Sequence, residues 1–447
     1  MSDRTRVAIK TFGCKLNQYE SEQIREDFET LGFEVVDFDQ PAEVYLINSC
    51  TVTHRTDRDT RRLARGARRR RPDCIIIVTG CYAQMQPQII EALEVVDLVA
   101  PIERKRELAR QAADRLARRG LISTPPDPAR SPDRLISHFP SNTRAFVKVQ
   151  DGCDAACAYC TITLARGPSR SVCPETALRQ ARMLTHAGHP EVVLVGIHLG
   201  MYGRDLTPPL TLDDLVREMC RIDALQRLRL SSIEPMEISD ELVEMVCAGG
   251  RSLDPSAGAP CEGKLCRHLH IPLQSGCDAT LERMRRPYRA TEYRHLIAKI
   301  RERDPMVGIG ADVMVGFPGE TDEEFEASHN FVERLPVNYL HVFTYSERPG
   351  TPAAEMPDQV NPEIRKRRMT RMRALSREKA EAFAEAAVGE TFEVVVETPR
   401  DEAGRLSGVA DNYLNVFFEG DDELTGQLVR VTLGEADGDR VSGVLVR

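Results

Sequence analysis

The 447-residue sequence has no long apolar segment, and its first residues, MSDRTRVAIKTFG, lack the apolar core of a secretion signal. The longest apolar runs, such as IIIV and VVLVGI, are far shorter than the roughly 20 residues that a membrane-spanning helix requires. Tandem repeats and low-complexity tracts are also missing. We therefore expect a cytoplasmic protein of about three folded domains, without membrane partners.

The sequence also has no excess of positive charge. Its formal net charge of −9 at pH 7 argues against a protein that binds polyanions over its whole surface. Basic residues are concentrated instead in two stretches, with nine arginines in residues 55–71 and eight basic residues in 361–381. Residues 388–447, by contrast, carry thirteen acidic and five basic side chains. The two basic stretches are candidate contacts for nucleic acid.

Residues 5–100 alternate short apolar runs with helical patterns, which is typical of a parallel sheet covered by helices. The predicted strands are RVAIKTFG, FEVVDF, VYLINSC and CIIIVTGC, and the predicted helices are NQYESEQIREDFETLG and the arginine-rich stretch. Residues 122–142 are rich in Pro and Ser, which predicts a linker.

The alternation restarts at residue 144. Six further strands are predicted at RAFVKVQ, EVVLVGIHL, RLRLSSI, HLHIPLQ, GIGADVMVGF and YLHVFTYS, and the helical patterns between them fit a partial or closed β/α barrel. A Gly/Pro-rich loop at 249–265 interrupts this region, and a long basic helix is predicted at 362–387. Five short strands with Gly/Asp turns in 388–447 predict a small antiparallel barrel.

Three of the 13 cysteines lie within DGCDAACAYC, and we call Cys153, Cys157 and Cys160 the barrel cysteine set. A disulfide framework is not expected in a large chain without a secretion signal. Thiolates bind soft metals, and three of them leave one iron of a [4Fe–4S] cluster open to a chelating ligand. The set follows the first predicted barrel strand, where active sites of such barrels lie. A zinc knuckle without its fourth ligand is the alternative.

The C-x3-C-x2-C array resembles that of the radical S-adenosylmethionine (SAM) superfamily, with Tyr159 as the aromatic residue before the last cysteine. The resemblance implies that the open iron chelates SAM. An electron from the cluster would then cleave SAM to methionine and a 5′-deoxyadenosyl radical, which abstracts hydrogen from an unactivated C–H bond.

Three more cysteines each follow a predicted strand, in TFGCKLNQYES, LINSCTVT and VTGCYAQ, and we call Cys14, Cys50 and Cys81 the N-terminal cysteine set. Because the carboxyl ends of parallel strands meet at one edge of a sheet, we expect these thiols to converge. They have the composition to hold a second cluster with one open iron. Cys74 stands at a strand start and is interpreted as a buried structural cysteine.

FGCKLNQYES, NSCTVT, TGCYAQ, GCDAACAYC with RGPSRS, HIPLQSG and VGFPGET together resemble the methylthiotransferases over nearly the whole chain. The KLN sequence after Cys14, the CTVT context and Tyr82 favour the MtaB type. The resemblance implies a flavodoxin-like α/β domain that binds an auxiliary cluster, a radical SAM (β/α)6 partial barrel with a basic C-terminal helix, and a TRAM-like β-barrel. We place them at residues 1–121, 143–383 and 384–447, with the linker at 122–142.

The resemblance further implies the addition of a methylthio group to C2 of N6-threonylcarbamoyladenosine at tRNA position 37. Each cysteine set would bind one [4Fe–4S] cluster. One SAM would methylate a sulfur at the N-terminal cluster, and a second SAM would give the radical at the barrel cluster. The reaction also requires an electron donor and a sulfur source, which the sequence does not identify. Residues 161–163 are TIT where the family often has Ile-Pro, and we expect little effect because the ligands are untouched.

Candidate SAM contacts follow from their positions near strand ends and the cysteine array: Tyr159, Gly196, Ser231, Glu234 and Gln274. Glycine permits close approach of a ligand to the backbone, and a carboxylate accepts from an ammonium or a ribose hydroxyl. The alternative is a strand-end glycine and caps of the following helices. His268 and His270, two apart on one strand, share a face and either line the barrel or serve as polar neighbours.

Five arginines of the first basic stretch recur near one helical face: Arg55, Arg58, Arg62, Arg65 and Arg69. Such a face neutralises phosphates with an affinity that falls with salt, unless it is only a solvated surface. The acidic C-terminal region offers at most a local RNA patch around Arg405, Tyr413 and Asn415, with aromatic stacking, or serves for packing.

The remaining cysteines suggest no further site. Cys261 and Cys266 form a C-x4-C pair that we interpret as one surface-loop and one strand cysteine, and four others are predicted to be packed or on the surface: Cys173, Cys220, Cys247 and Cys277. Alternative functions are methylthiolation of isopentenyladenosine in tRNA or of ribosomal protein S12. A further alternative is a non-catalytic zinc and RNA-binding module, which the two incomplete cysteine triads disfavour.

Overall fold

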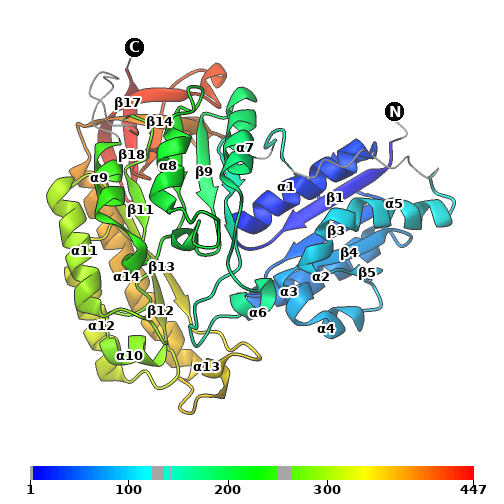
Figure 1. The fold of residues 1–447 in the computed structure, drawn as a ribbon, viewed down its shortest axis with the longest axis horizontal. Helices are drawn as coiled ribbons and strands as arrows, with labels where there is room; N and C mark the ends of the chain where they lie inside the picture. Colours follow the sequence, from blue (N-terminus) through cyan, green and yellow to red (C-terminus); the bar gives the residue numbers. More distant parts are fainter. Residues whose placement is uncertain (1–3, 123–134, 141, 250–260, 262, 447) are drawn as a thin grey trace. The chain divides into compact units, whose positions relative to one another are not determined.

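A computed structural model of the chain describes residues 4–122, 135–140, 142–249, 261 and 263–446. Most of the predicted linker and most of the 249–265 loop lie outside these residues. The chain divides into two compact units (Figure 1), the first formed by Met1–Ile136 with Thr161–Pro168, and the second by Ser137–Cys160 with Ser169–Arg447. None of the helices in the described ranges has both the length and the apolar character needed to cross a membrane.

The first unit is built on a five-stranded parallel sheet in the order β2-β1-β3-β4-β5. Its strands are β1 (Arg6–Thr11), β2 (Glu34–Val36), β3 (Val44–Ser49), β4 (Ile75–Gly80) and β5 (Leu98–Val99). This is the flavodoxin-like order, as predicted. The direction of winding reverses between β1 and β3, and ligand crevices in such sheets form at the carboxyl ends of the strands beside that point.

Helices cover both faces of this sheet because side chains alternate along each strand. On one face, α1 (Lys15–Thr30) and α5 (Leu108–Arg118) pack against Val7, Leu46 and Ile77. On the other face, α2 (His54–Arg70) packs Ala64 and Ala67 against the strands. The small residues on α2 allow a close approach of that helix, and its arginines occupy the remaining surface.

The second unit contains the six predicted barrel strands in two parallel three-stranded sheets, β10-β9-β6 and β11-β12-β13. A parallel bridge between Leu228 and Leu265 joins the sheets into one arc. The strands are β6 (Ala145–Lys148), β9 (Glu191–Val195), β10 (Arg227–Leu230), β11 (His268–His270), β12 (Gly308–Val315) and β13 (Tyr339–Thr344). Among the described residues β6 and β13 do not pair, so the barrel is partial.

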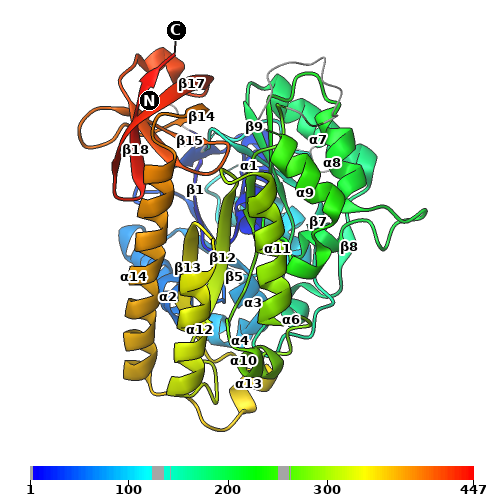
Figure 2. The ribbon, with the colours of Figure 1, turned by 90° about the vertical axis from the view of Figure 1, so that its left-hand side faces the viewer.

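The arc is flanked by helices in the predicted alternation (Figure 2). They are α7 (Pro174–His186), α8 (Leu212–Cys220), α9 (Asp240–Ala248), α10 (Asp278–Arg283), α11 (Ala290–Arg303), α12 (Asp322–Arg334) and α14 (Pro362–Ala386). The basic helix α14 packs against β13, and several of its cations are bound within the unit. Arg368 pairs with Glu320, and Lys379 donates to the carbonyls of Glu333 and Leu335. These contacts give much of the second basic stretch a structural role.

The C-terminal strands close into a five-stranded barrel in the order β14-β15-β16-β18-β17. They are β14 (Thr391–Glu397), β15 (Leu406–Ala410), β16 (Asn415–Phe418), β17 (Leu428–Asp437) and β18 (Arg440–Leu445). The predicted small antiparallel barrel is present, and one of its strand pairs, β16 with β18, runs parallel. A closed ring with an odd number of strands cannot alternate direction throughout, so one parallel pair is required.

This small barrel is fastened to the N-terminal ends of the β/α strands. Arg229 on β10 donates to the carbonyl oxygens of Ala410 and Asp411, each at 3.0 Å, and Arg267 pairs with Asp411 at 2.7 Å. Tyr413 stacks its ring on His268 with a centroid distance of 4.5 Å. Tyr413 is therefore part of the packing between the two barrels, which removes it from the RNA patch considered with Arg405 and Asn415.

Candidate metal centres

The N-terminal cysteine set follows three neighbouring strands of the first sheet. Cys14 is the N-cap of α1 just after β1, Cys50 follows β3 directly, and Cys81 begins α3 (Cys81–Met85) after β4. The strand order places β3 between β1 and β4, so the three cysteines share one carboxyl edge beside the point where the winding reverses. Cys14 and Cys81 both contribute to the electrostatic environment of Cys50, and Cys14 to that of Cys81, in keeping with thiols along one edge of the sheet.

Two glycines make this convergence sterically possible. Gly13 has φ +93°, and a Cβ at that position would lie 2.7 Å from both Cβ and Sγ of Cys50. Gly80 has φ +90°, and a Cβ there would lie 2.3 Å from the carbonyl oxygen of Ser49. A left-handed backbone and a close contact both require glycine at these turns.

Burial controls the protonation of Cys50 and Cys81. Burial, with smaller contributions from Cys81, Cys14 and Asp57, raises the pKa of Cys50 to about 12. Burial also raises the pKa of Cys81, while Arg166 and Lys105 oppose that shift. Without a metal the buried thiols are protonated, and a bound metal would displace their protons.

A buried charged cluster lies beside Cys81. Glu20 on α1 accepts from Arg166 at 2.9 Å and also pairs with Lys105, while Arg166 donates to Asn17 at 2.7 Å. Arg166 ends α6 (Ile162–Arg166), which packs against α3. Two cations thus share one carboxylate, and their remaining positive charge favours anionic sulfur at Cys81. No role was predicted for Arg166, although it is the first residue of the RGPSRS motif.

The barrel cysteine set lies in the loop after β6 and is braced by Gln150. Its side-chain amide donates to the carbonyl of Gly152 at 2.8 Å and to Ser169 Oγ at 2.9 Å. Its Oε1 accepts from the backbone N–H of His198 at 2.8 Å. A Cβ at Gly196 would lie 2.9 Å from that oxygen, so the glycine makes room for the side chain of Gln150.

Two sulfurs of the barrel cysteine set have polar partners that sequence reasoning missed. His198 Nδ1 lies 3.2 Å from Cys153 Sγ, and Arg286 donates to Cys157 Sγ at 3.1 Å. Burial alone would lower the pKa of His198, but its hydrogen bonds to Cys153 and to Glu237 raise it to about 10. The only available signals were the strand-end position of His198 and the basic run before Pro287.

The structure places the candidate SAM contacts as follows. The ring of Tyr159 packs edge-on against that of Phe317, with the ring centroids 6.3 Å apart. Glu234 forms an ion pair with Arg286. Ser231 Oγ and Gln274 Oε1 are buried and have no hydrogen-bond partner among the described residues. Buried polar atoms are normally satisfied, so these two indicate a missing polar ligand at the ends of β10 and β11. The two residues therefore fit a polar cofactor at this position.

The donor set of each cysteine triad fits an iron–sulfur cluster better than a single ion. In the described part of the chain, the donor atoms of one group of three His, Cys, Asp or Glu residues all lie within 4.8 Å of one another. That group is His270, Asp312 and His341, and it contains no cysteine. The three sulfurs of neither triad therefore all lie within 4.8 Å of one another, whereas a zinc ion is normally bound by four closely spaced ligands. Thiolates that are spread over several metal atoms are typical of a cluster.

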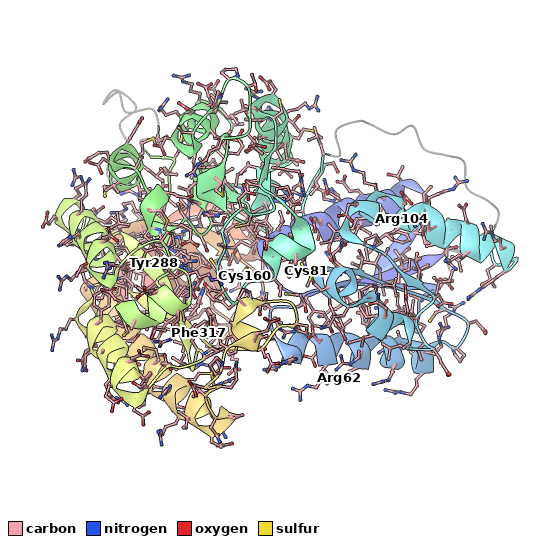
Figure 3. The ribbon with its side chains drawn as sticks, turned by 60° about the horizontal axis from the view of Figure 1, so that its bottom comes forward. Arg62, Cys81, Arg104, Cys160, Tyr288 and Phe317 are labelled. Carbon is pink, nitrogen blue, oxygen red and sulfur yellow. The ribbon has the colours of Figure 1, made fainter. Side chains whose placement is uncertain are left out.

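The five predicted arginines of α2 lie together on its exposed side, and Figure 3 shows Arg62 pointing away from the sheet. Arg55 and Arg62 are near Asp59, whereas Arg58, Arg65 and Arg69 form no ion pair within the described ranges. The other arginines of the stretch stabilise the fold. Arg68, for example, pairs with Asp97 at 2.6 Å.

The remaining cysteines lie in the core or at the surface, with one correction. Cys261 was expected in a surface loop, but it is buried, with its Sγ 4.0 Å from Met245 Sδ. Cys74, Cys220, Cys247 and Cys266 are buried, Cys173 is exposed, and Cys277 is half-buried. Cys261 is buried because it packs against α8 and α9.

Comparison with known proteins agrees with this arrangement. The family described as "Uncharacterized protein family UPF0004" matches residues 6–101, and the radical SAM superfamily matches residues 147–332. The chain is 39% identical to "Threonylcarbamoyladenosine tRNA methylthiotransferase MtaB" of Bacillus subtilis, over 99% of this chain and 96% of the relative. The chain belongs to the MtaB family of radical SAM methylthiotransferases.

Other relatives extend this result. The protein of the same name from Aquifex aeolicus is 36% identical over 96% of this chain and 100% of the relative. The "tRNA-2-methylthio-N(6)-dimethylallyladenosine synthase" of Syntrophotalea carbinolica is 33% identical over 95% of this chain and 96% of the relative. The solved structure of the radical SAM methyltransferase TsrM from Kitasatospora setae shares the fold, with a TM-score of 0.55 and 15% identity over 78% of this chain and 77% of that one. As a member of the MtaB family, this chain is an enzyme whose cofactors are SAM and [4Fe–4S] clusters.

Proposed function

We propose that this enzyme adds a methylthio group to C2 of N6-threonylcarbamoyladenosine at position 37 of tRNA. The observation that carries the proposal is the presence of two incomplete cysteine triads in a chain related over its full length to enzymes named for that modification. Because the substrate is a tRNA, we place the enzyme in the cytoplasm.

We assign the N-terminal cysteine set and the barrel cysteine set to one [4Fe–4S] cluster each. When bound, the barrel cluster supplies the electron for SAM cleavage, and the N-terminal cluster carries the sulfur that is transferred. His198 and Arg286 are positioned to hydrogen-bond the sulfurs of Cys153 and Cys157, which stabilises anionic thiolates. Arg166 and Lys105 contribute positive charge beside Cys81.

The proposed SAM site lies at the ends of β9, β10 and β11. Ser231 Oγ and Gln274 Oε1 would find in SAM the hydrogen-bond partners that they lack within the protein. Gln274 is held in the left-handed region at φ +66°, and such strain in a non-glycine residue is common at binding sites. Glu234 is fixed by Arg286 and would accept from the SAM ammonium or ribose.

The exposed arginines of α2 are the proposed contact for the tRNA backbone. Helix α2 begins shortly after Cys50, so Arg55 and Arg58 in its first turns lie on the carboxyl side of the sheet, and Arg62, Arg65 and Arg69 extend the basic surface along the helix. Arg58, Arg65 and Arg69 form no ion pair among the described residues and are available to phosphate.

The test begins with the metal content of anaerobically reconstituted enzyme. Wild type should hold about eight irons with matching sulfide, and replacing either cysteine set by alanine should leave about four. Nucleoside analysis of tRNA should then show 2-methylthio-N6-threonylcarbamoyladenosine with wild type and with neither triple variant. Zinc in place of iron, or methylthiolation of isopentenyladenosine alone, would overturn the proposal.

The two sets should differ in what they disable. Cys157→Ala should abolish 5′-deoxyadenosine formation, because the barrel cluster is required for SAM cleavage. Cys50→Ala should retain some SAM cleavage while losing methylthio transfer. Both products are measured in the same single-turnover reaction, and full product formation by both variants would contradict the assignment of two clusters.

A further inference from the structure

In β11, β12 and β13 one face is apolar, and the other carries a group of polar side chains next to Met314 and Phe343. Leu269, Val313 and Val342 alternate with polar residues and are buried. The opposite face carries His268, His270, Asp312, Tyr339 and His341. Helix α14 packs against β13, and its Ser376 hydrogen-bonds the backbone of Leu340, whose side chain is on the apolar face. Packing of the core explains the apolar face, but it does not require this concentration of imidazole and carboxylate groups on the other.

Three of these side chains form a compact cluster. Asp312 Oδ1 lies 3.0 Å from His270 Nε2 and 3.3 Å from His341 Nδ1. The two imidazole rings stack with centroids 4.7 Å apart. The exposed fraction of the side chain rises from 8% at His270 through 24% at Asp312 to 59% at His341. The cluster thus has a buried end and an end open to a ligand.

The buried end is rigid. The Tyr339 hydroxyl lies 2.8 Å from His268 Nε2 and 3.4 Å from His270 Nδ1. The ring of Tyr413, from the loop that fastens the C-terminal barrel, stacks on His268 and on Tyr339. Arg229 lies 5.2 Å from the centre of the Tyr413 ring. His270 and Asp312 are therefore held in place before any ligand arrives.

The cluster is adjacent to the proposed SAM site. The backbone N–H of Gln274 donates to the carbonyl of Asp312 at 2.8 Å, and Met314 N–H donates to the carbonyl of Gln274 at 2.9 Å. Asp312 therefore lies one strand away from the residue whose buried amide oxygen lacks a partner. The register partner of Gln274 is Val313, so the cluster and the proposed SAM site are neighbours through the backbone of β12.

We propose that His270, Asp312 and His341 bind the threonylcarbamoyl group of the substrate adenosine. This inference rests on the proposed function. The group carries a carboxylate, a hydroxyl and carbamoyl N–H groups. His341 directs Nδ1 at Asp312, so its Nε2 is placed to accept from the hydroxyl or a carbamoyl N–H in the neutral ring and to donate to the carboxylate in the protonated ring. Asp312 is placed to accept from the hydroxyl or an N–H. An isopentenyl group offers none of these bonds, and a site built for polar groups rejects an analogue that leaves them unpaired.

A divalent ion is the competing occupant, because the three donor atoms lie within 4.8 Å of one another. Both imidazole rings are already directed at Asp312, and the Tyr339 hydroxyl stands at the other nitrogen of His270. The protein by itself thus completes the hydrogen bonding of the buried end without an ion. The side of the cluster that is open to solvent is the side chain of His341, which is 59% exposed. An exposed side chain suits a substrate group better than an ion that must be enclosed by its ligands.

The test compares wild type with His341→Phe, which keeps an aromatic ring and removes the polar nitrogens. Dissociation constants are measured at one salt concentration for tRNA carrying N6-threonylcarbamoyladenosine and for the same tRNA with unmodified adenosine. Wild type should prefer the modified tRNA, and the variant should lose about tenfold or more of that preference. Asp312→Asn is the second variant and should lose preference in the same direction. His295→Phe, on the exposed side of α11, is the matched control and should keep the preference.

The outcomes separate this inference from the proposed function. If wild type forms no methylthiolated threonylcarbamoyladenosine, the proposed function fails. If wild type forms it and His341→Phe keeps both the preference and kcat/KM, only the inference fails. Titration with Co2+ gives an independent result: a visible d–d absorption band with wild type that is missing from His341→Phe would assign the cluster to a metal ion and overturn the inference.

Discussion

Arg166 donates a buried hydrogen bond of 2.9 Å to the carboxylate of Glu20. Arg166 is the last residue of α6, which starts two residues after Cys160, and Glu20 lies in the first turns of α1. Residues 161–168 belong to the N-terminal unit although they directly follow Cys160. The ion pair therefore fastens α6 within the first unit, where the charge of Arg166 acts on Cys81. Lys105 shares the same carboxylate, so the charge of Glu20 serves two cations.

Glu20→Gln should destabilise the protein more than Lys105→Met. The first change leaves two buried cations without their anion, whereas the second leaves a neutral Arg166–Glu20 pair. Breaking a buried ion pair by removing one partner costs about 3–5 kcal/mol. Urea unfolding followed by circular dichroism of the two variants checks this order. Equal midpoints would mean that the two cations do not depend on this carboxylate.

Gly13→Ala should selectively impair the N-terminal cysteine set. The added Cβ would lie 2.7 Å from Cys50 Sγ, and the backbone at φ +93° is strained for alanine. We expect about half of the iron to be lost on reconstitution, with the barrel cluster retained. Gly32→Ala is the control, since Gly32 has φ +84° but nothing within 4 Å of its added Cβ. Equal loss in both variants would attribute the effect to backbone strain alone.

Replacing Arg58, Arg65 and Arg69 by serine should weaken tRNA binding without unfolding the first unit, because all three side chains are exposed. Each phosphate contact contributes to the salt dependence, so the slope of log K against log salt concentration should become shallower by about 2. The matched control replaces Arg106, Arg115 and Arg118, which belong to the segment containing α5 on the other face of the sheet. An unchanged slope in the α2 variant would exclude this helix from the interface.

Glu191 should contribute stability that is lost in acid. Burial alone would raise its pKa, but the charges of Arg229 and Arg227 hold the pKa at about 2 in the fold, against an ordinary value of 4.5. The contribution, about 3 kcal/mol from the pKa difference, is fully present above pH 4.5 and disappears as the pH falls towards 2.

The measurement for Glu191 is the urea midpoint of wild type and Glu191→Gln between pH 7 and pH 3. The variant should be clearly less stable at pH 7, since Arg227 and Arg229 would lose their shared anion, and the difference should shrink below pH 4.5. Glu385→Gln, at an exposed position on α14, should show no such trend. A difference that stays constant with pH would show that packing, not charge, explains the effect.

Much of the architecture could be predicted because its signals are local. Apolar runs between helical patterns identified β1, β3, β4 and the six strands of the β/α arc, since buried parallel strands are rich in apolar residues, although β10 and β11 alternate them with Arg and His. The flavodoxin-like order was predicted from resemblance. The cysteine sets were found because their ligand types occur at strand ends or at close spacing. Their role as cluster ligands remains a prediction.

Tertiary structure decided what stands beside those cysteines. His198 reaches Cys153 across 45 residues of sequence and Arg286 reaches Cys157 across 129, through hydrogen bonds that no local pattern encodes. The parallel β16–β18 pair follows from closing five strands into a ring, and the burial of Cys261 from packing against α8 and α9.

The sequence by itself determined the family, the strand and helix alternation and the two thiol triads, because each is marked by local motifs: a close spacing for the barrel set, and a cysteine directly after an apolar run for each member of the N-terminal set. Only the tertiary structure assembled His270, Asp312 and His341, which stand on three strands separated by long helical connections. Strand order and register bring these side chains onto one face, and neither is specified by the composition of a single strand. For that reason the chemistry of the cysteines was visible in the sequence, while the proposed selectivity for the substrate was not.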